Sequence, residues 1–202
     1  MNLLFALTLF LSACWMLKAL QQRQRIAFLA AFLSRFRIEK NLETVTQGYL
    51  RALGEQDEAR QAQVWQLLEA SERELCAQVT RLAADFATSD PGRTRVSKLP
   101  VWLPFATVLF PSFDMRAVLA VHARGICQAM EEAGSSARDR AFTVSAELFL
   151  LQHSCHWFCR SRLVASGRML ATHKTSYQQL LDAVSARTRT EYLGLVSLGA
   201  RG

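Results

Sequence analysis

Charged residues are absent from residues 1 to 17, and no Lys or Arg precedes the apolar stretch that fills this range. A secretory signal needs a basic segment ahead of its apolar core, so this absence argues against export of the chain. The basic residues follow the stretch instead, at Lys18, Arg23, Arg25, Arg35 and Arg37. By the positive-inside rule, we expect the N-terminus to face outward and the rest of the chain to lie in the cytoplasm.

The apolar stretch predicts one transmembrane helix, residues 1–20, in a bacterial inner membrane. At about 1.5 Å per residue it is about 30 Å long, which is enough to cross the hydrocarbon core. Two alternatives stay open. The letters LSAC resemble the lipidation box of a lipoprotein with Cys14 as the lipidated residue, although the apolar run continues past Cys14 where a lipoprotein has a polar linker. The stretch could also be a buried helix of a soluble protein.

Glycine and proline are scarce, with nine and four in 202 residues, and neither occurs before Gly48. Nothing therefore forces a break, and we expect one long helix to leave the membrane and join the body. The sequence has no Gly-rich nucleotide loop, no GxSxG nucleophile motif, no HExxH zinc motif and no CxxCH haem motif. These absences predict that the protein is not an enzyme.

Lysine is rare as well: only four occur, and the net charge of +7 comes mostly from arginine. A basic balance is typical of proteins that contact nucleic acid or anionic lipid. No block of like charge forms a binding tail, so we expect a solvated or membrane-apposed surface, with a basic nucleic-acid-binding domain as the weaker alternative. Hydrophobic residues make up 50% of the chain, which fits one membrane segment plus a folded domain.

Residues 55–88 predict the best amphipathic helix of the chain, because apolar residues recur at spacings of three and four. The stripe consists of Val64, Leu68, Ser71, Leu75, Val79, Leu82 and Phe86. We expect this stripe to pack in the core of the chain. It would also support a homo-oligomer by pairing with a second copy, although Ser71 and Gln78 dilute the apolar seam.

Residues 89–113 predict a loop followed by a Pro-rich apolar link, residues 101–113. Pro100, Pro104 and Pro111 deny the link a continuous helix, and it is too short to span a membrane. Buried core is the default interpretation. The alternatives are a loop that dips into the membrane surface, where Trp and Phe are favoured, and an exposed docking patch for a partner.

The remaining residues, 114–202, predict the C-terminal helices of the bundle. A helix capped by Ser112 or Asp114 should run to about Met130. An unbroken helical stretch should follow over 137–167, apolar nearly all round and therefore central, and a last helix should lie near 171–192. The fold class is thus all-α: an N-terminal transmembrane helix (1–20), juxtamembrane and long amphipathic helices (21–88), the loop and link (89–113), and a bundle of about four to five helices in all.

One group of residues suggests metal chemistry. Four potential ligands fall within seven residues of the central helix: His153, Cys155, His156 and Cys159. On a helix, Cys155, His156 and Cys159 share a 100° arc, so they could provide three ligands to zinc, another transition metal or a haem. His122 or Cys127 could provide a fourth. The spacing matches no established metal signature, and cysteine in an apolar helix is also typical of a buried core.

Taken together, the patterns favour a membrane-anchored, non-enzymatic adaptor or assembly protein whose bundle binds other proteins in the cytoplasm. The main alternative is a metal- or haem-binding membrane protein that uses the Cys155, His156 and Cys159 cluster. A cytoplasmic bundle would keep its thiols reduced.

Overall fold

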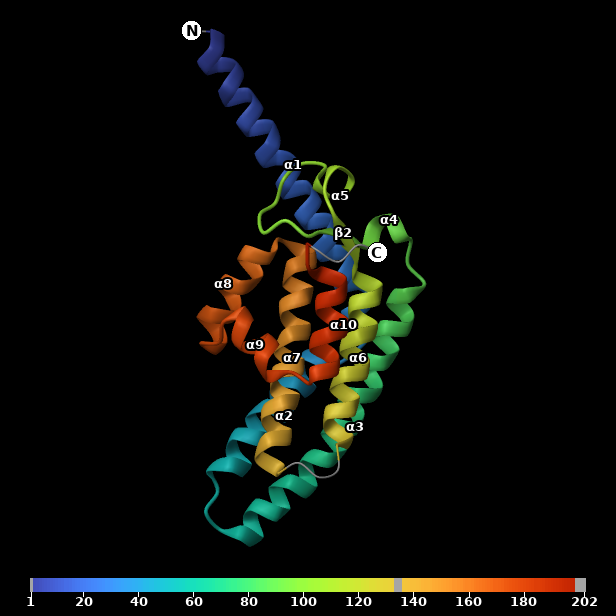
Figure 1. Ribbon diagram of the computed structural model, residues 1–202, viewed down its shortest axis with the longest axis vertical. Coiled ribbons are helices and arrows are strands. Elements are labelled where there is room, and N and C mark those ends of the chain that lie inside the picture. The colour runs from blue at the N-terminus through green and yellow to red at the C-terminus, as the bar shows by residue number, and fades with distance from the viewer. Residues whose placement is uncertain (1, 133–135, 199–202) are drawn as a thin grey trace.

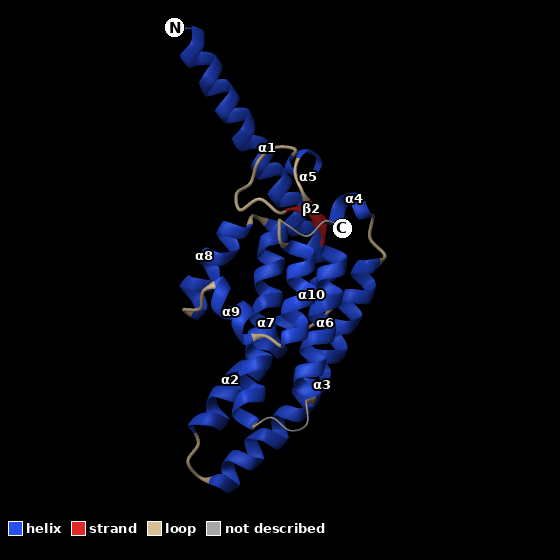
Figure 2. Cartoon of the chain, viewed as in Figure 1, coloured by secondary structure: helices blue, strands red, loops and turns tan. Residues whose placement is uncertain are grey.

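The computed structural model describes residues 2–132 and 136–198. It confirms the all-α prediction, because 81% of the chain is helical. The described residues form ten helices and two short strands, and one long helix projects from a bundle formed by the others (Figures 1 and 2).

Helix α1 (Asn2–Leu33) has two parts with different surroundings. Its N-terminal part extends away from the rest of the molecule (Figure 1). Its C-terminal part packs on the bundle, where Leu29 is buried and the Phe28 and Phe32 rings contact the Phe86 ring at centroid distances of 5.5 and 5.1 Å. The projecting part and the packed part therefore belong to one continuous helix.

The predicted long helix that leaves the membrane and joins the body is confirmed by α1. Its end was not predicted: the chain turns at residues 34–37, and α2 (Ile38–Gly54) begins there. The buried face of α2 explains the turn: Ile38, Leu42, Val45 and Tyr49 can pack on α3 only if the chain leaves the line of α1. The turn is held by the Arg37 backbone N–H, which donates to Oε1 of Gln78 at 2.8 Å. Helix α2 ends at Gly54.

Helix α3 (Glu58–Ala87) confirms the predicted amphipathic helix, and Asp57 caps it by accepting from the Arg60 N–H. Its apolar stripe is buried in the chain, which confirms core packing over an exposed seam. The buried members are Leu68, Leu75, Val79, Leu82 and Phe86. The Tyr49 hydroxyl donates to buried Glu72 at 2.5 Å and ties α2 to α3. This stripe is therefore occupied within the chain.

The predicted loop contains short elements: α4 (Pro91–Thr94), β1 (Arg95–Ser97), α5 (Ala106–Leu109) and β2 (Ser112–Asp114). The two strands pair antiparallel, with Arg95 opposite Asp114 and Ser97 opposite Ser112. They form the small sheet shown in red in Figure 2. The sheet closes the base of the apolar link, so the link leaves and re-enters the bundle at one place.

Helices α6 (Met115–Glu131) and α7 (Ala137–Cys159) form the centre of the bundle. Asp114 caps α6, as predicted, by accepting from the Arg116 N–H at 2.9 Å. Buried residues lie on nearly all sides of α7, which confirms its predicted central position. A disulfide between Cys76 and Cys127 joins α3 to α6.

The predicted continuous helix to Gly167 and the last helix near 171–192 are wrong in their bounds. The chain forms α8 (Arg162–His173), α9 (Tyr177–Ala183) and α10 (Ala186–Val196) instead. Each begins after a serine whose side chain accepts a backbone N–H, at Ser161, Ser176 and Ser185. Serine is a strong N-cap but a weak stop signal in a sequence, which is why the breaks were not predicted.

Gly125 on α6 allows α7 and α10 to approach closely. A Cβ there would lie against Oγ1 of Thr188 and 2.8 Å from Oε2 of Glu147, and both residues are buried. We expect Gly125→Ala to lower the free energy of unfolding by about 1–3 kcal/mol, because the packed site cannot move aside freely. Denaturant unfolding of the full chain in detergent measures this effect.

Gly194→Ala is the matched control, since no atom of the described residues lies within 4 Å of a Cβ at this position in α10. Removing a helical glycine there should raise stability by about 0.5–1 kcal/mol. Equal effects of the two substitutions would contradict the close approach at Gly125.

Candidate functional site

The projecting part of α1 exposes apolar side chains on every side. The exposed large residues are Leu3, Leu4, Phe5, Leu7, Leu9, Phe10, Leu11, Trp15, Met16, Leu17 and Leu20. Helix α1 has a stretch with a mean hydropathy of 2.0, so it is long and apolar enough to cross a membrane. Lys18 is the single charged side chain among the first 20 residues. Cys14 lies within this part of α1 as a free thiol.

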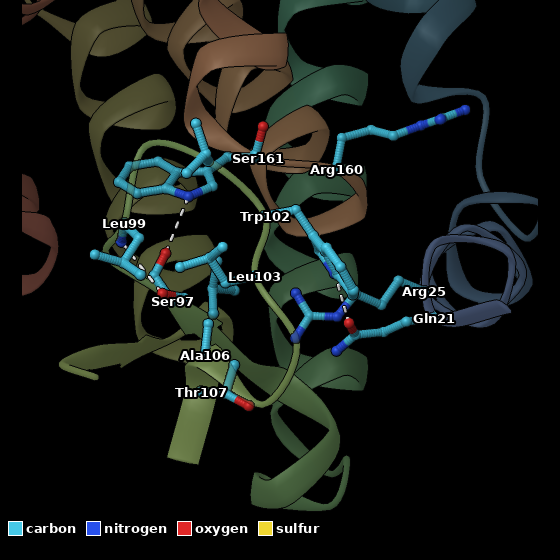
Figure 3. A pocket seen from close by; sticks show the side chains of 13 residues that line it. Gln21, Arg25, Ser97, Leu99, Trp102, Leu103, Ala106, Thr107, Arg160 and Ser161 are labelled. Atoms are coloured by element: carbon cyan, nitrogen blue, oxygen red, sulfur yellow. Dashed lines mark hydrogen bonds between the residues drawn. The ribbon is translucent and has the colours of Figure 1, made fainter. Parts of the chain in front are cut away.

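Polar contacts fix α1 to the bundle directly after its exposed apolar part. Gln21 accepts a hydrogen bond from the Trp102 indole N–H at 2.6 Å, and Figure 3 shows these two side chains facing each other. Gln22 accepts from Arg160 at 2.7 Å. Arg25 donates to the backbone carbonyls of Phe158 and Arg95 at 3.0 and 2.7 Å. We call this set of contacts the junction.

The apolar link lies beside the junction and is largely exposed, so the default prediction of a buried core segment is wrong. Only Ala106 and Phe113 are buried there. Six large apolar residues are exposed: Val101, Leu103, Phe105, Val108, Leu109 and Phe110. The three prolines predicted the broken backbone correctly. Apolar composition alone, however, does not distinguish a buried segment from an exposed apolar surface.

The cysteine and histidine cluster is split by the structure. Cys155, His156 and Cys159 line a cavity of about 410 Å³ between α7, α1 and α2. His153 points elsewhere: it is buried, stacks on Tyr177 at 4.5 Å and contacts the Ser166 hydroxyl at 3.1 Å. Three of the four predicted ligands therefore share one wall of a cavity, and the fourth does not.

The chemistry of this cavity wall favours thiols over metal-binding thiolates. Burial raises the pKa of Cys155 to about 12, and the neighbouring Cys159 adds to the shift. Burial also raises the pKa of Cys159 to about 11, although nearby Arg25 and Arg160 act in the opposite direction. Metal ligation requires the deprotonated form.

A complete ligand set is not assembled at the cavity. Over residues 2–132 and 136–198, no group of three or more His, Cys, Asp or Glu side chains is arranged to hold a metal ion. The fourth ligands suggested from the sequence are engaged elsewhere, since His122 contacts Ser154 and Cys127 is in the disulfide. The metal or haem site stays a prediction.

Buried polar side chains form a second group in the middle of the bundle. His122 Nε2 lies 2.8 Å from the Ser154 hydroxyl, which donates to the Leu150 carbonyl and contacts the Tyr192 hydroxyl at 3.4 Å. A serine beside a histidine is the arrangement of an activated nucleophile. Here both side chains are fully enclosed, with exposed fractions of 1% and 0%, so a substrate has no access to them.

A third feature is a wide groove at the end of the bundle away from the projecting part of α1. We call it the distal groove, and it has a volume of about 820 Å³. Leu50 and Leu53 of α2 and Phe142 of α7 line it with exposed apolar side chains, and Phe149 stacks on His173 at 4.0 Å. No sequence signal predicted it, because its walls come from segments about 90 residues apart.

Comparisons with protein-family models, with curated proteins and with solved structures found no match to this chain.

Burial of two histidines makes the stability of the bundle depend on pH. Burial lowers the pKa of His122 and of His153 to about 3, and His153 and His156 respectively add to these shifts by charge repulsion. In the unfolded chain both imidazoles bind a proton below about pH 6.5, whereas in the folded chain they stay neutral down to about pH 3. We expect the free energy of unfolding to fall as pH drops from about 6.5 towards 3, with up to about 1.4 kcal/mol per pH unit for each histidine.

Buried Glu147 has the opposite effect on the pH dependence of stability. Burial raises its pKa, so the folded chain holds the Glu147 proton more tightly than the unfolded chain, and this stabilisation is lost as pH rises. Two histidines outweigh one carboxyl, so the net slope should stay positive between about pH 5 and 7. Denaturant unfolding across this range measures the slope, and His122→Gln should reduce it. A flat profile for the unaltered chain would contradict the burial of neutral histidines.

Proposed function

We propose that this protein is a membrane-anchored, non-enzymatic adaptor or assembly protein. The observation on which the proposal depends is the placement of two exposed apolar surfaces at opposite ends of the molecule. At one end α1 exposes a stretch of the length and composition that a bilayer requires. At the other end the distal groove exposes apolar side chains of α2 and α7. Such a molecule can hold a partner protein at a fixed distance from a membrane.

We infer that the anchor lies in a bacterial inner membrane with the bundle in the cytoplasm. Basic residues follow the apolar part of α1 within the distance over which the positive-inside rule acts. The Cys76–Cys127 disulfide argues for an oxidising compartment. The basic residues determine the orientation of the anchor at insertion, whereas a disulfide forms and opens reversibly afterwards. The cytoplasmic placement is therefore inferred from the charges.

A pair of reporters fused to the C-terminus of the full chain tests this orientation. We expect a fluorescent reporter that matures in the cytoplasm to be active and a phosphatase that requires the periplasm to be silent. Thiol trapping in intact cells should find Cys76 and Cys127 reduced. Asn2→Lys combined with Leu3→Lys supplies the missing basic segment and should shift some molecules to the opposite orientation. An active phosphatase together with an oxidised Cys76–Cys127 pair would overturn the cytoplasmic placement.

The distal groove has the composition of a protein-docking site. Its lining combines leucine and aromatic side chains with charges of both signs, at Arg138, Asp139 and Asp182. Apolar side chains together with polar and charged ones are usual in a protein interface. We propose that a helix or loop of a partner protein inserts an apolar side chain between Leu50 and Phe142.

Photocrosslinking in living cells tests the groove, with benzoylphenylalanine in place of Phe142. We expect one discrete crosslinked protein, and we expect Leu50→Arg in the same chain to abolish it. Leu50 is 73% exposed, so the charge should not unfold the bundle. Leu67 is the control position, because it is 76% exposed and lies outside the groove. The same crosslinked protein from position 67, or its persistence in Leu50→Arg, would contradict docking in the groove.

A further inference from the structure

The apolar link and the projecting part of α1 form adjacent exposed apolar surfaces. Both lie on the same side of the bundle, with the link and α5 next to the point where α1 leaves it (Figure 1). Six large side chains of the link are exposed, and Val108 is 83% exposed. An exposed apolar patch of this kind marks an interaction surface in a stable protein.

The junction fixes the position of the link along the axis of α1. Gln21 contacts Trp102 directly after the last exposed apolar residue of the projecting part, Leu20. If residues 3–20 cross the hydrocarbon core, they occupy about 27 Å of it, and Gln21 reaches the headgroup level. Trp102 is then held at that same level, where an indole ring is favoured.

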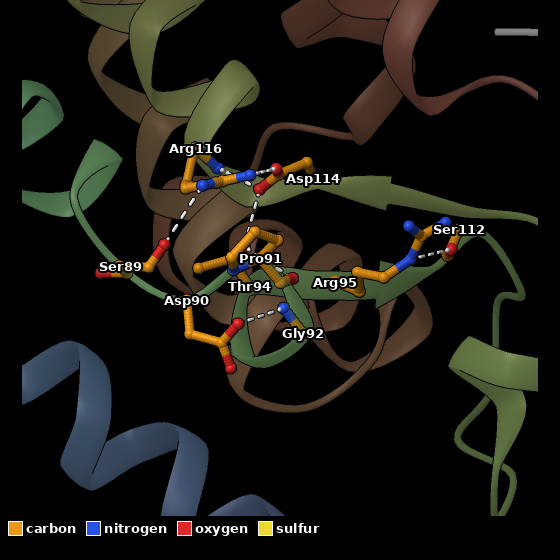
Figure 4. A network of polar contacts seen from close by, with 9 residues as sticks. All are labelled: Ser89, Asp90, Pro91, Gly92, Thr94, Arg95, Ser112, Asp114 and Arg116. Atoms are coloured by element: carbon orange, nitrogen blue, oxygen red, sulfur yellow. Dashed lines mark hydrogen bonds and ion pairs between the residues drawn. The ribbon is translucent and has the colours of Figure 1, made fainter.

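The exposure of the link is built into the fold. At its base, the Asp114 carboxylate accepts from the Thr94 hydroxyl at 2.8 Å and pairs with Arg116 at 2.6 Å, and Arg116 also donates to the Ser89 carbonyl (Figure 4). Burial acts to raise the pKa of the Asp114 carboxyl, but its hydrogen bonds with Arg116 and Thr94 together outweigh burial, so the pKa is lowered and the carboxyl is ionised. The same pairing raises the pKa of Arg116. The base therefore holds the link in place.

Contacts farther along keep the link close to α1 and α8. The Pro100 carbonyl accepts from the Leu163 N–H at 2.9 Å. Between the link and α1, the cavity at the junction measures only about 30 Å³ (Figure 3). At the tip, Phe105 adopts a left-handed backbone with a φ of 57° and stays 69% exposed. A bulky residue in this conformation stores strain that a surrounding structure or a ligand must offset.

The charges around the link suit an anionic surface. No Asp or Glu occurs between Asp90 and Asp114, whereas Arg93 and Arg95 lie at the start of this segment and are exposed. Lys98 is unavailable for such contacts because its ammonium group is buried and donates to the Ser197 carbonyl at 2.8 Å. Arginines beside an apolar patch are typical of segments that lie in the headgroup region of a membrane.

We propose that the apolar link inserts into the headgroup and acyl boundary of the same bilayer that α1 crosses, as a second and shallower membrane contact. The occupant of this surface is lipid, because the link continues the apolar surface of α1 at the level where the span ends. The inference rests on the membrane anchoring of the proposed function. With two contacts, the bundle would sit at a fixed tilt and rotation on the membrane instead of swinging about a single helix.

Three phenylalanines of nearly equal exposure allow a matched test: Phe5 at 67%, Phe105 at 69% and Phe142 at 66%. Each is replaced in turn by benzoylphenylalanine in the full chain. The purified variants are reconstituted into vesicles of phosphatidylethanolamine and phosphatidylglycerol, irradiated, and analysed for lipid adducts by mass spectrometry. Circular dichroism confirms that each variant keeps its helical content.

We expect lipid adducts at positions 5 and 105 and at least tenfold fewer at position 142. An adduct at position 5 without one at position 105 overturns the shallow contact and leaves the anchor intact. Adducts at neither position overturn the anchor itself, and with it the proposed function. Equal adducts at 105 and 142 overturn the inference too, because they show nonspecific contact. A protein–protein crosslink at 105 in place of a lipid adduct would assign the link to a partner or a second copy.

Discussion

The contacts of Gln21, Gln22 and Arg25 determine how the rest of the molecule is arranged. They attach the apolar part of α1 to the bundle at one defined level, through Trp102, Arg160 and two backbone carbonyls. Amide and guanidinium groups suit this place, because they can hydrogen-bond to protein on one side and to headgroups or water on the other. The directional hydrogen bonds fix its height.

The centre of the bundle has a different character, because it accepts polar groups that a simple apolar core would exclude. His122, Ser154, Tyr192 and Glu147 are buried around α7. Glu147 accepts from the Ser185 N–H at 3.1 Å, so it connects the start of α10 to α7. Such groups cost free energy unless they are paired, and each pairing restricts the arrangement of the neighbouring residues. His122 Nε2 and Glu147 Oε1 have partners, whereas His122 Nδ1 and Glu147 Oε2 have none among the described residues. The short C-terminal helices, which bury few side chains, gain a defined position in this way.

The sequence allowed the long elements to be predicted, because their signals are local and repeat many times. The stripe of α3, the Asp114 cap of α6 and the apolar surface of α7 each follow from residues a few positions apart. Two of the failures share a physical cause. The turn after Leu33 is held by Gln78 and the position of the link by Gln21, and both residues are distant in the chain. Likewise, the cluster at 153–159 could be found from its spacing, but burial separates His153 from the rest and raises the pKa of the thiols.

Exposed apolar area gives a common explanation for the two ends of the molecule. A soluble protein with Val108 and Phe105 exposed at one end and Leu50 and Phe142 at the other would be prone to association. Each patch is therefore expected to be in contact with another molecule in the cell, and the surroundings of the two patches favour different contacts. The link adjoins an apolar helix of membrane-spanning length and contains no charged residue between Val101 and Phe113, which suits lipid. The distal groove lies far from that helix and has charges of both signs among its lining residues, which suits protein. This difference is the physical basis for assigning one end to the membrane and the other to a partner.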